Sequence, residues 1–551
     1  MSETTPLLEN SPTITAYSDG SATEYTPSSA SSRTWIPQAR SDRTLVLCFD
    51  GTGDQFDQDN SNIVQFLAML RKDDTSKQLV YYQAGIGTYT NPVLVTPVIS
   101  QVSETLDEMF AWNLSAHVKG GYEFLMQNYA AGDKICIFGF SRGAYTARAL
   151  AGMLQKVGLL PVCNHQQLPF AYTMYARDDE EGLKLSVMFK RTFSIDVKIE
   201  FLGVWDTVAS VGLVPRSLPF VGTNSAIRFF RHALSLDERR AKFMPSFYIQ
   251  SAENVHLTAS PRPAPVRRQT SQIKAYEDEE NAKSGFTTDV LEVWFAGVHC
   301  DVGGGSVRNG ERHSLARIPL RWMIRECFEA KTGIIFDAHM LQNEVGMNVD
   351  FDKMSLKPLP PRLSPRPELK TQHIQPNDDI PSFFSSLWKF VWSAVSFPFI
   401  LLTSLITGGR KPSINLEPRL RSPFLDEDVE ELQDALSPIY DQLPRQWYWR
   451  VLEWIPLHVK KQKALVAQTD NENDYVWTIN KGRGRKVFRH VMDRQLKIHR
   501  SVKTRLEALD AAGKAGTYIP QIRPKLTHEP ARRMTHQDWN VNESTWFKWW
   551  D

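Results

Sequence analysis

A serine flanked by two glycines stands where an apolar run gives way to a helical stretch. Residues 134–150 read KICIFGFSRGAYTARAL, in which Gly139, Ser141 and Gly143 form the pattern G-x-S-x-G. The apolar run 135–138 predicts a short strand buried on both faces, and the composition after the second glycine favours a helix. Glycines suit a sharp turn whose backbone crowds its neighbours. The pattern therefore predicts a strained strand–turn–helix that presents the Ser141 hydroxyl as a nucleophile.

A serine nucleophile needs a base that takes its proton and a third group that orients the base. Asp206 directly follows the apolar run 198–205 (KIEFLGVW), and His299 directly follows the run 290–298 (VLEVWFAGV). Residues at the carboxyl ends of parallel strands meet at one edge of the sheet. The chain order Ser, Asp, His is also the order found in α/β-hydrolases. We therefore expect His299 to act as general base for Ser141 and Asp206 to fix its tautomer.

Simpler interpretations compete with the catalytic one. A glycine-flanked serine also suits an ordinary turn between a strand and a helix, and an aspartate after a strand is often a helix N-cap. His232 and His313, in helical surroundings, are weaker alternatives for the base. Three residues at three strand ends, in the required order, favour the triad over these alternatives.

Backbone N–H groups are needed to stabilise the negative charge that develops on the attacked carbonyl oxygen. The amide of Arg142, directly after the nucleophile, is the standard first donor in this arrangement. The turn at Gly51 and Thr52, after the first apolar run, is the candidate for the second donor, since glycine lets backbone approach a ligand closely. The run Gly303–Gly305 either adds a donor or shapes the loop that carries the base.

Two other chemistries fit parts of the same region. The run LVLCFDGTG (45–53) resembles the D-x-D-G-T start of haloacid-dehalogenase-type phosphatases, but Cys48 occupies the nucleophile's position and cannot form an aspartyl phosphate. Carboxylates gathered at one sheet edge also suit Mg²⁺ or Ca²⁺. The spacing demands no such site, so we expect neither a metal nor a cofactor. The candidate ligands of that rival site are Asp50, Asp54, Asp206 and Asp301.

Apolar runs alternate with helical stretches along the first part of the chain. Besides the three runs that lead to the candidate triad, buried strands are predicted at 43–49 and 78–82, and helices begin near 60, 100 and 315. Strands that alternate with helices at this rhythm form βαβ units and a mainly parallel sheet. We therefore predict an α/β protein, α/β-hydrolase-like, whose mainly parallel sheet is flanked by helices, with helical insertions and a helical C-terminal region.

At 551 residues the chain is too long for one ordinary hydrophobic core. Composition divides it into four parts. Residues 1–40 are rich in Ser and Thr and are expected to be disordered, whereas 41–350 form the catalytic core, with a mobile insertion at 255–285. A Pro-rich linker and an apolar segment occupy 351–411, and 412–551 form the helical C-terminal region.

Charge and cysteine content restrict the partners and the compartment. Lys and Arg number 64 against 62 Asp and Glu, which leaves a net charge of +2 and argues against a nucleic-acid binder. The five cysteines are widely spaced, without a C-x-x-C pair, which favours a reducing intracellular setting. The N-terminus lacks the basic and apolar regions of a signal peptide. We therefore expect a cytoplasmic protein.

The most apolar part of the chain lies at 383–407. Its main part, Phe390–Thr407, holds 18 residues without a charge, at the lower edge of the length that spans a bilayer. Pro398 argues against a span, while the flanking Trp, Lys and Arg side chains suit an anchor at the membrane interface. We expect the segment to associate with a membrane. A single membrane span, a buried helix and a lid over the acyl pocket are the alternatives.

Basic and tryptophan-rich stretches mark the C-terminal region. In 481–509, Arg and Lys alternate with apolar residues at helical spacing, which favours a solvated amphipathic face over a phosphate-binding patch. The tail Trp546–Trp550 (WFKWW) either docks on the domain or contacts a membrane interface. The sequence leaves the oligomeric state open.

Six ordered motifs carry a family resemblance over residues 43–330. The motifs are CFDGTGD (48–54), AGIGT (84–88), GFSRGAYTAR (139–148), FLGVWDTVASVG (201–212), HALSLDERRAKFMP (232–245) and WFAGVHCDVGGG (294–305). On them, the chain resembles the α/β-hydrolase family of uncharacterised domains that includes the catalytic domain of bacterial type VI secretion phospholipase effectors, and it looks like a fungal-type member. IHRSVKTRLEA (498–508) is a fainter match.

The resemblance implies a Ser-Asp-His esterase that acts on lipid esters, with phospholipase activity in some members. Ser141, Asp206 and His299 stand at the matching positions. Cys300 departs from the serine that is more usual in the family. The insertions at 255–285 and 355–410 lie outside the shared motifs. The substrate class of the family is therefore a weak guide to the substrate of this protein.

Chemistry and resemblance together predict a serine ester hydrolase, a phospholipase or lipid acyl esterase, that works through an acyl-enzyme on Ser141. Its partners would be a lipid ester substrate and a membrane surface reached through 383–407. The alternative is a catalytically inactive hydrolase fold that serves as a membrane-associated binding protein.

Overall fold

The computed structural model describes most of the chain between residues 34 and 551. The described residues are 34–38, 42–51, 56, 58–85, 101–208, 218–248, 287–364, 426–445, 447–454, 456–460, 475–487, 495–524, 532–539, 541, 544 and 546–551. The predicted disordered start of the chain up to residue 33, the predicted insertion at 255–285 and the apolar segment 383–407 lie outside them.

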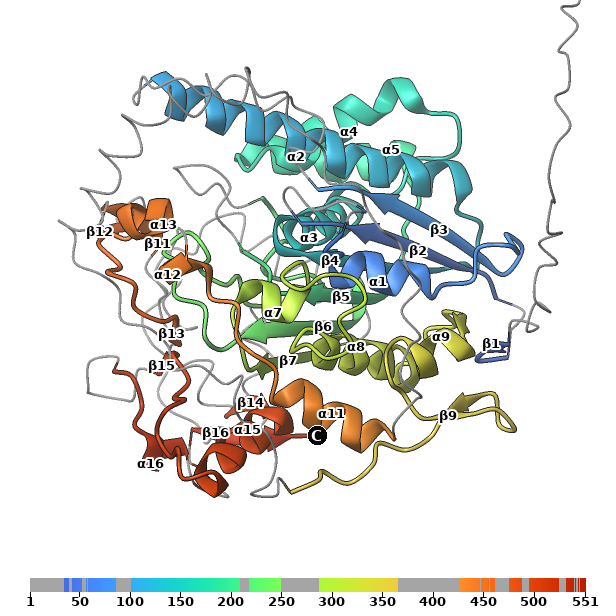
Figure 1. Ribbon diagram of the computed structural model, residues 1–551. Coiled ribbons are helices and arrows are strands. Elements are labelled where there is room, and N and C mark those ends of the chain that lie inside the picture. The colour runs from blue at the N-terminus through green and yellow to red at the C-terminus, as the bar shows by residue number, and fades with distance from the viewer. Residues whose placement is uncertain are drawn as a thin grey trace, which may run out of the picture.

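An eight-stranded sheet forms the centre of the molecule, in the order β16-β14-β7-β6-β5-β4-β2-β3 (Figure 1). Every neighbouring pair runs parallel. The strands are β2 (Thr44–Phe49), β3 (Gln78–Gln83), β4 (Lys134–Phe140), β5 (Ile199–Trp205), β6 (Ile227–Ser235), β7 (Asp289–Phe295), β14 (Leu496–His499) and β16 (Phe547–Trp550). The predicted α/β-hydrolase-like fold with its parallel sheet is confirmed.

Alternate residues of a central strand belong to two separate hydrophobic cores. In β2, Val46 and Cys48 pack on one side of the sheet, whereas Leu45, Leu47 and Phe49 pack on the other. All six residues of β2 are buried. Continuous burial of this kind is expected of a parallel strand whose two faces are both covered by helices.

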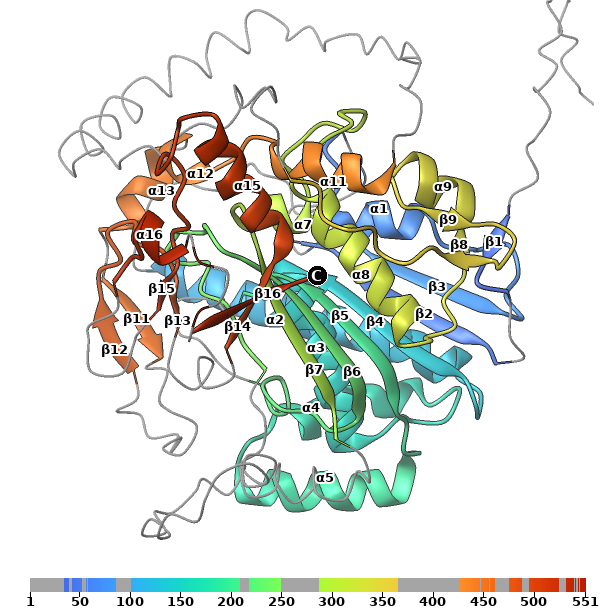
Figure 2. The same ribbon diagram turned by 90° about the horizontal axis from the view of Figure 1, so that it is seen from below.

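Helices cover both faces of the sheet, and Figure 2 shows the two groups on opposite sides of it. One group consists of α2 (Gln101–Asn128), α3 (Ser141–Val157), α4 (Leu168–Ala176) and α5 (Glu180–Phe193). The other group consists of α1 (Asn62–Ala68), α8 (Arg317–Glu329), α11 (Glu427–Ala435) and α15 (Arg500–Ala511).

Short elements complete the described fold. Its short helices are α7 (His299–Gly303), α9 (Ala338–Asn343), α12 (Gln442–Arg445), α13 (Trp447–Leu452), α16 (His536–Trp539) and a 3₁₀ turn at His165–Gln167. The strand pairs are β1 (Trp35–Ile36) with β8 (Phe336–Asp337), β9 (Val349–Asp350) with β10 (Ser355–Leu356), β11 (Leu457–Lys460) with β12 (Tyr475–Thr478), and β13 (Lys486–Val487) with β15 (Arg523–Pro524).

The folded core begins earlier than the composition indicated. Residues 34–38 were expected to belong to a disordered segment, but Trp35 and Ile36 pair with Phe336 and Asp337. Ile36 is fully buried. Burial of one large apolar side chain stabilises this short strand. The Ser- and Thr-rich residues before it gave the sequence no sign of a strand here.

The C-terminal region is only partly helical. It contributes α11 and α15, as expected, but also β14 and β16, which extend the central sheet beyond β7 (Figure 2). The tail predicted to dock or to meet a membrane becomes the edge strand β16, with Phe547 buried. Strand β14 is four residues long and runs directly into α15, so in the sequence its apolar residues continue the helical spacing of the following stretch.

The basic stretch 481–509 is not a solvated face throughout. Arg485 and Arg505 are fully buried, and Arg500 is nearly so. Arg500 pairs with Glu431 of α11, and Arg505 donates to the carbonyl oxygens of Ala435 and Ser437. Helical spacing alone did not distinguish arginines that pair across a tertiary contact from arginines that face water.

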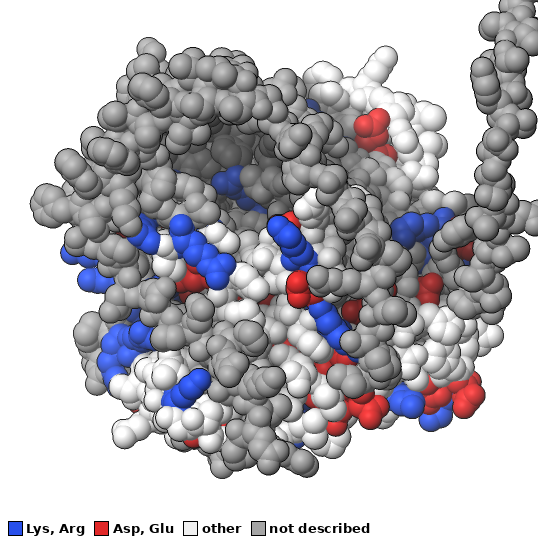
Figure 3. Space-filling view, viewed as in Figure 1, with Lys and Arg blue, Asp and Glu red and all other residues white. Residues whose placement is uncertain are grey.

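On the face seen in Figure 3, acidic and basic side chains of the described residues lie near one another. None of the helices in the described ranges combines the length and the hydropathy that crossing a membrane requires.

The pairing of β14 with β7 predicts that the C-terminal region stabilises the whole core. Ile498 of β14 is fully buried and pairs with Trp294. Ile498→Ala should lower the free energy of unfolding by about 2–5 kcal/mol, because the cavity cannot collapse. Chemical denaturation followed by tryptophan fluorescence measures this change.

Ile195 offers the matched control, since its side chain is 46% exposed. Ile195→Ala should change the same free energy by less than about 0.5 kcal/mol. Equal effects of the two substitutions would show that β14 is not part of the cooperative core.

Candidate active site

The glycine-flanked serine forms a tight turn between β4 and α3. Ser141 has a φ of 57°, in the left-handed region that a residue with a side chain rarely adopts. A Cβ on Gly139 would lie 2.6 Å from the Cα of Ala144, and a Cβ on Gly143 would overlap the carbonyl oxygens of Phe49 and Asp50. Both glycines are therefore required by the close packing of this turn against β2 and α3.

The structure brings together the three residues predicted to form a triad. The Nε2 atom of His299 lies 2.8 Å from Ser141 Oγ, and its Nδ1 atom lies 2.6 Å from Asp206 Oδ2. Ser141 is 6% exposed, His299 3% and Asp206 0%. They stand at the carboxyl ends of β4, β5 and β7, which belong to one run of neighbouring strands. A serine hydroxyl, an imidazole and a carboxylate in this chain can pass a proton from Ser141 to His299.

Two aromatic rings hold the imidazole in place. The ring centroids of Phe140 and Phe243 each lie 4.8 Å from that of His299. The backbone N–H of His299 donates to Glu238 Oε2 over 3.2 Å. These contacts limit rotation of the ring, so its two nitrogens stay directed at Ser141 and Asp206.

The run Gly303–Gly305 shapes the loop behind His299. A Cβ on Gly303 would overlap the ring of Phe140, and Gly304 has a φ of 84° where its backbone meets Ser61. Of the two roles considered for this run, the packing supports the shaping of the loop. Asn62 secures the same loop by donating to the carbonyl oxygens of Val302 and Ala316.

A buried arginine from the C-terminal region binds the carboxylate of Asp206. Arg485 Nη1 donates to Asp206 Oδ1 over 2.6 Å, and Arg485 Nη2 donates to Oδ2 over 2.8 Å. The backbone N–H of Ser235 adds a bond of 2.9 Å to Oδ1. Sequence reasoning missed Arg485, because it stands in the basic, glycine-containing run KGRGRK with no neighbouring pattern that indicates a site.

Burial and this pairing set the charges of the site. Burial alone would raise the pKa of Asp206, but the charge of Arg485 and the hydrogen bonds from His299 and Arg485 hold that pKa far below its ordinary value. Burial lowers the pKa of His299, and the neighbouring Asp206 only partly offsets this effect. At neutral pH the site therefore holds an ionised carboxylate and a neutral imidazole, the forms that base catalysis requires.

Two of the three residues predicted to form the oxyanion hole, Arg142 and Gly51, lie within the described structure. Arg142 is the second residue of α3 and lies in its first turn. The N–H of Gly51 donates to Asp50 Oδ1 over 2.8 Å, and Thr52 lies outside the described residues. Ser61 and Tyr82 also donate to Asp50, so this carboxylate fixes the loop beside the nucleophile.

The two alternative histidines do not join the site. His232 is fully buried between Glu292, 2.9 Å from its Nδ1, and the backbone N–H of Thr207, which donates to its Nε2 over 3.1 Å. It thereby fixes the residue that follows Asp206, which is a structural role. His313 lies beside the acidic residues of α11.

The described carboxylates of the rival metal site, Asp50, Asp206 and Asp301, have protein partners. Asp301 accepts from the N–H groups of Val298 and Tyr440, and Asp54 lies outside the described residues. Within the described part of the chain, no three acidic, histidine or cysteine side chains are grouped as a metal ion would need.

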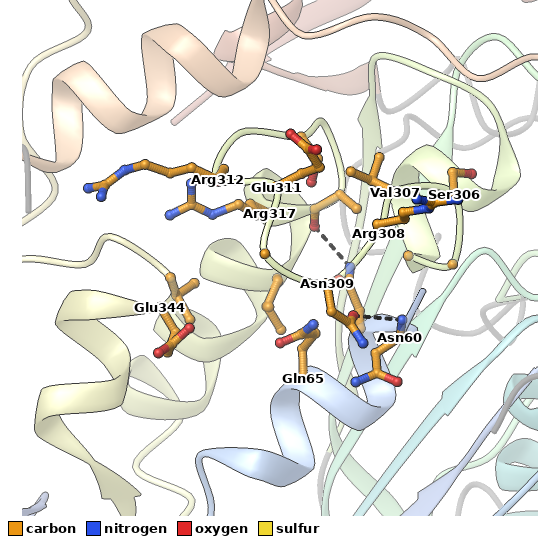
Figure 4. Close-up of a pocket in the computed structure, with 18 of the residues that line it drawn as sticks. Asn60, Gln65, Ser306, Val307, Arg308, Asn309, Glu311, Arg312, Arg317 and Glu344 are labelled. Carbon is orange, nitrogen blue, oxygen red and sulfur yellow. Dashed lines mark hydrogen bonds between the residues drawn. The ribbon is translucent and has the colours of Figure 1, made fainter. Parts of the chain in front are cut away.

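A polar cavity of about 260 Å³ flanks the loop that follows His299 (Figure 4). Cys300 and Asp301 line it from α7, and Asn60 and Gln65 line it from the start of α1. The backbone N–H of Asn60 donates to Asn309 Oδ1 over 2.9 Å at its edge. None of the three triad residues lines this cavity, so it is separate from the nucleophile.

The parallel sheet and the nucleophile turn define the protein as an α/β-hydrolase-like protein. The family model "T6SS, Phospholipase effector Tle1-like, catalytic domain" matches residues 43–326. The chain therefore belongs to this family of Tle1-like catalytic domains.

The individual proteins that the chain resembles share less than a third of its residues in the aligned regions. The uncharacterized protein YEL023C of Saccharomyces cerevisiae is 29% identical over an alignment of 411 residues. The match covers 56% of this chain and 60% of the yeast protein. A crystal structure of an uncharacterized protein from Pseudomonas aeruginosa has a TM-score of 0.30 at 20% identity and covers 53% of this chain and 46% of that chain. The structure of the Tle1 effector bound to the VgrG spike has a TM-score of 0.23 at 19% identity and covers 48% of this chain and 52% of that chain. Structural similarity at this level carries no functional argument.

The packing of the turn predicts that Gly143 cannot be replaced. Gly143→Ala should lower the free energy of unfolding by more than about 3 kcal/mol, because its Cβ would meet backbone oxygens that have no room to move. Gly132 has a φ of 98° but open space around it, so Gly132→Ala should cost only about 1–3 kcal/mol of backbone strain. Thermal unfolding compares the two, and a Gly143 variant as stable as the Gly132 variant would contradict the described turn.

Proposed function

We propose that this protein is a serine ester hydrolase that cleaves an acyl ester of a lipid, with a phospholipid as the favoured substrate class. The hydrogen-bonded chain from Ser141 through His299 to Asp206 carries the proposal. Membership in the Tle1-like phospholipase effector family supports the choice of a lipid ester.

In the proposed reaction, His299 Nε2 takes the proton of Ser141 Oγ while that oxygen attacks the ester carbonyl. The backbone amide of Arg142 stabilises the oxyanion, and collapse of the tetrahedral intermediate releases the alcohol, which receives the proton from His299. The acyl group is then bound to Ser141. A water molecule, activated by the same imidazole, releases the fatty acid and restores the serine.

We also propose that the apolar segment 383–407 brings the enzyme to a membrane surface or covers the acyl chain. Its composition is the support for this part of the proposal, since 18 uncharged residues flanked by Trp, Lys and Arg suit a membrane interface. An enzyme that cleaves lipid esters must reach substrate that is held in a bilayer.

Replacement of the nucleophile tests the proposal directly. Ser141→Ala should reduce hydrolysis of short p-nitrophenyl esters at least about a thousandfold while the protein stays folded, because the imidazole loses the group that it activates. Ser186→Ala is the matched control, since Ser186 is a buried serine on α5 that donates to Leu183 and should leave activity unchanged. Full activity of the Ser141 variant would remove that residue from the mechanism.

A fluorophosphonate probe separates the enzyme from the alternative, a catalytically silent hydrolase fold that binds membranes. An activated Ser141 should be labelled covalently, and mass spectrometry should locate the adduct on the peptide that contains GFSRG. A folded preparation that takes up no label would favour the binding protein. Release of fatty acid from phospholipid vesicles then identifies the ester that is cleaved.

The lowered pKa of His299 predicts the acid limb of the pH profile. Burial lowers this pKa below its ordinary value of 6.5, and only the neutral imidazole accepts the serine proton. Activity should therefore be full above this pKa and fall as the pH drops through it, with a midpoint below 6.5. The pH dependence of kcat/KM measures that midpoint in the free enzyme.

Asp301 needs its own control, because burial raises its pKa to about 7 and it stands two residues from His299. Asp301→Asn removes this titration and keeps an oxygen that can accept a backbone N–H. The acid limb should stay where it is in this variant. A limb that disappears with Asp301 would assign the titration to that carboxyl instead.

A further inference from the structure

All five N–H donors of the Arg485 guanidinium have acceptors in the described structure. Besides its two bonds to Asp206, Nη1 donates to the carbonyl oxygen of Ser235 over 3.1 Å and to its hydroxyl over 2.7 Å. Nε and Nη2 both donate to the carbonyl oxygen of Phe243, over 3.0 and 2.7 Å. The side chain is 1% exposed. A fully satisfied planar fork of this kind has one orientation available.

The backbone of Arg485 is fixed as firmly as its side chain. Its carbonyl oxygen accepts from the N–H of Arg523 over 2.8 Å, at the start of the β13–β15 pairing. A Cβ on the preceding Gly484 would overlap the carbonyl of Gln521, so the two segments are in close contact. The backbone that carries the guanidinium is therefore held against residues 521–523 of the C-terminal region.

The same contacts link two sides of the site. Ser235 ends β6 and donates to Asp206, while Phe243 packs its ring on His299. Arg485 bonds to Asp206, Ser235 and Phe243 at once. It therefore ties the carboxylate, the neighbouring strand end and one wall of the imidazole pocket into a single unit.

We infer that Arg485 is a positioning residue of the active site: it holds both oxygens of the Asp206 carboxylate so that the carboxylate meets His299 Nδ1 in one fixed orientation. The inference rests on the proposed function, because it assigns Arg485 a part in that reaction. It extends the site beyond residues 43–326, the part of the chain that the family model covers.

Charge distinguishes this role from a purely structural one. The charged groups around His299 are Asp206 with Arg485 and Glu238 with Arg240, and Asp301 lies two residues further on. Asp206 and His299 are coupled, so their protonation belongs to the pair. Removal of the Arg485 charge must raise the apparent pKa of that pair, whichever member takes the proton.

The test replaces Arg485 with methionine, which keeps most of the volume and removes the charge. The rate at which a fluorophosphonate labels Ser141 is measured against pH, since labelling needs the neutral imidazole but no natural substrate. For Arg485→Met the acid limb should move upward by at least about half a pH unit relative to the wild type. A folded variant whose limb stays at the wild-type position would overturn the inference.

Arg500→Met is the matched control. Arg500 is also a buried arginine of the C-terminal region, and it bonds to both carboxylate oxygens of Glu431. Its loss should destabilise the protein as the loss of a buried ion pair does, but the acid limb should not move. An equal shift in this variant would mean that the limb reports general loosening, which also overturns the inference.

Arg485→Lys keeps the inference testable if the methionine variant does not fold. A lysine keeps the charge but cannot bond to both oxygens as a planar fork does. This variant should show an acid limb near that of the wild type, an unchanged KM and a kcat at least tenfold lower on p-nitrophenyl esters. Full kcat would show that the fork geometry is not needed and would overturn the inference.

Failure of the proposed function gives a different result. A folded wild-type protein that neither takes up the probe nor cleaves esters would remove the reaction itself, together with any part of Arg485 in it. The other outcome is a wild-type protein that is labelled at Ser141 and Arg485 variants that keep its acid limb and its kcat. That outcome would overturn the role of Arg485 and leave the proposed function standing.

Discussion

The buried negative charge of Asp206 is the constraint on which the rest of the site depends. An ionised carboxylate with no exposure to water is costly unless it is paired and hydrogen-bonded. Here Arg485, His299 and Ser235 together supply that compensation. The bonds that keep the Asp206 carboxylate ionised also fix its orientation. One set of contacts therefore offsets the cost of burying the charge and aligns the imidazole of His299.

Other buried carboxylates near the site also join distant segments through hydrogen bonds. Asp237 accepts from the N–H groups of Gly297 and Gln521 and from the hydroxyl of Tyr518, and so ties the loop before His299 to the C-terminal region. Glu453 of that region in turn accepts from the N–H of Ala241. The segments that carry the imidazole are thus fixed from outside the matched family domain. The C-terminal region therefore contributes contacts that hold the candidate site together.

Sequence patterns singled out three residues that the structure brings together, but they gave no sign of the long-range contacts around them. Ser141, Asp206 and His299 were placed because each follows an apolar run, and a parallel sheet gathers such positions at one edge. Arg485 was missed, because its partner Asp206 lies 279 residues away and no local pattern marks a buried arginine. Strand β14 was missed for a different reason. Its four residues are too few to show the alternation of apolar and polar residues that identifies a strand.

Charge around His299 also bears on how the base works. Asp206 and Glu238 contribute two negative charges near the ring, and Arg485 and Arg240 contribute two positive ones, so the formal charges of these four groups sum to zero. In the proposed reaction an imidazolium would form in this buried setting, and burial is the largest cause of the lowered pKa of His299. A base of this kind stays unprotonated until the serine proton arrives. In the proposed reaction, an imidazole whose pKa is lowered by burial would return that proton readily to the leaving alcohol, although the hydrogen bond to Asp206 partly offsets the effect of burial.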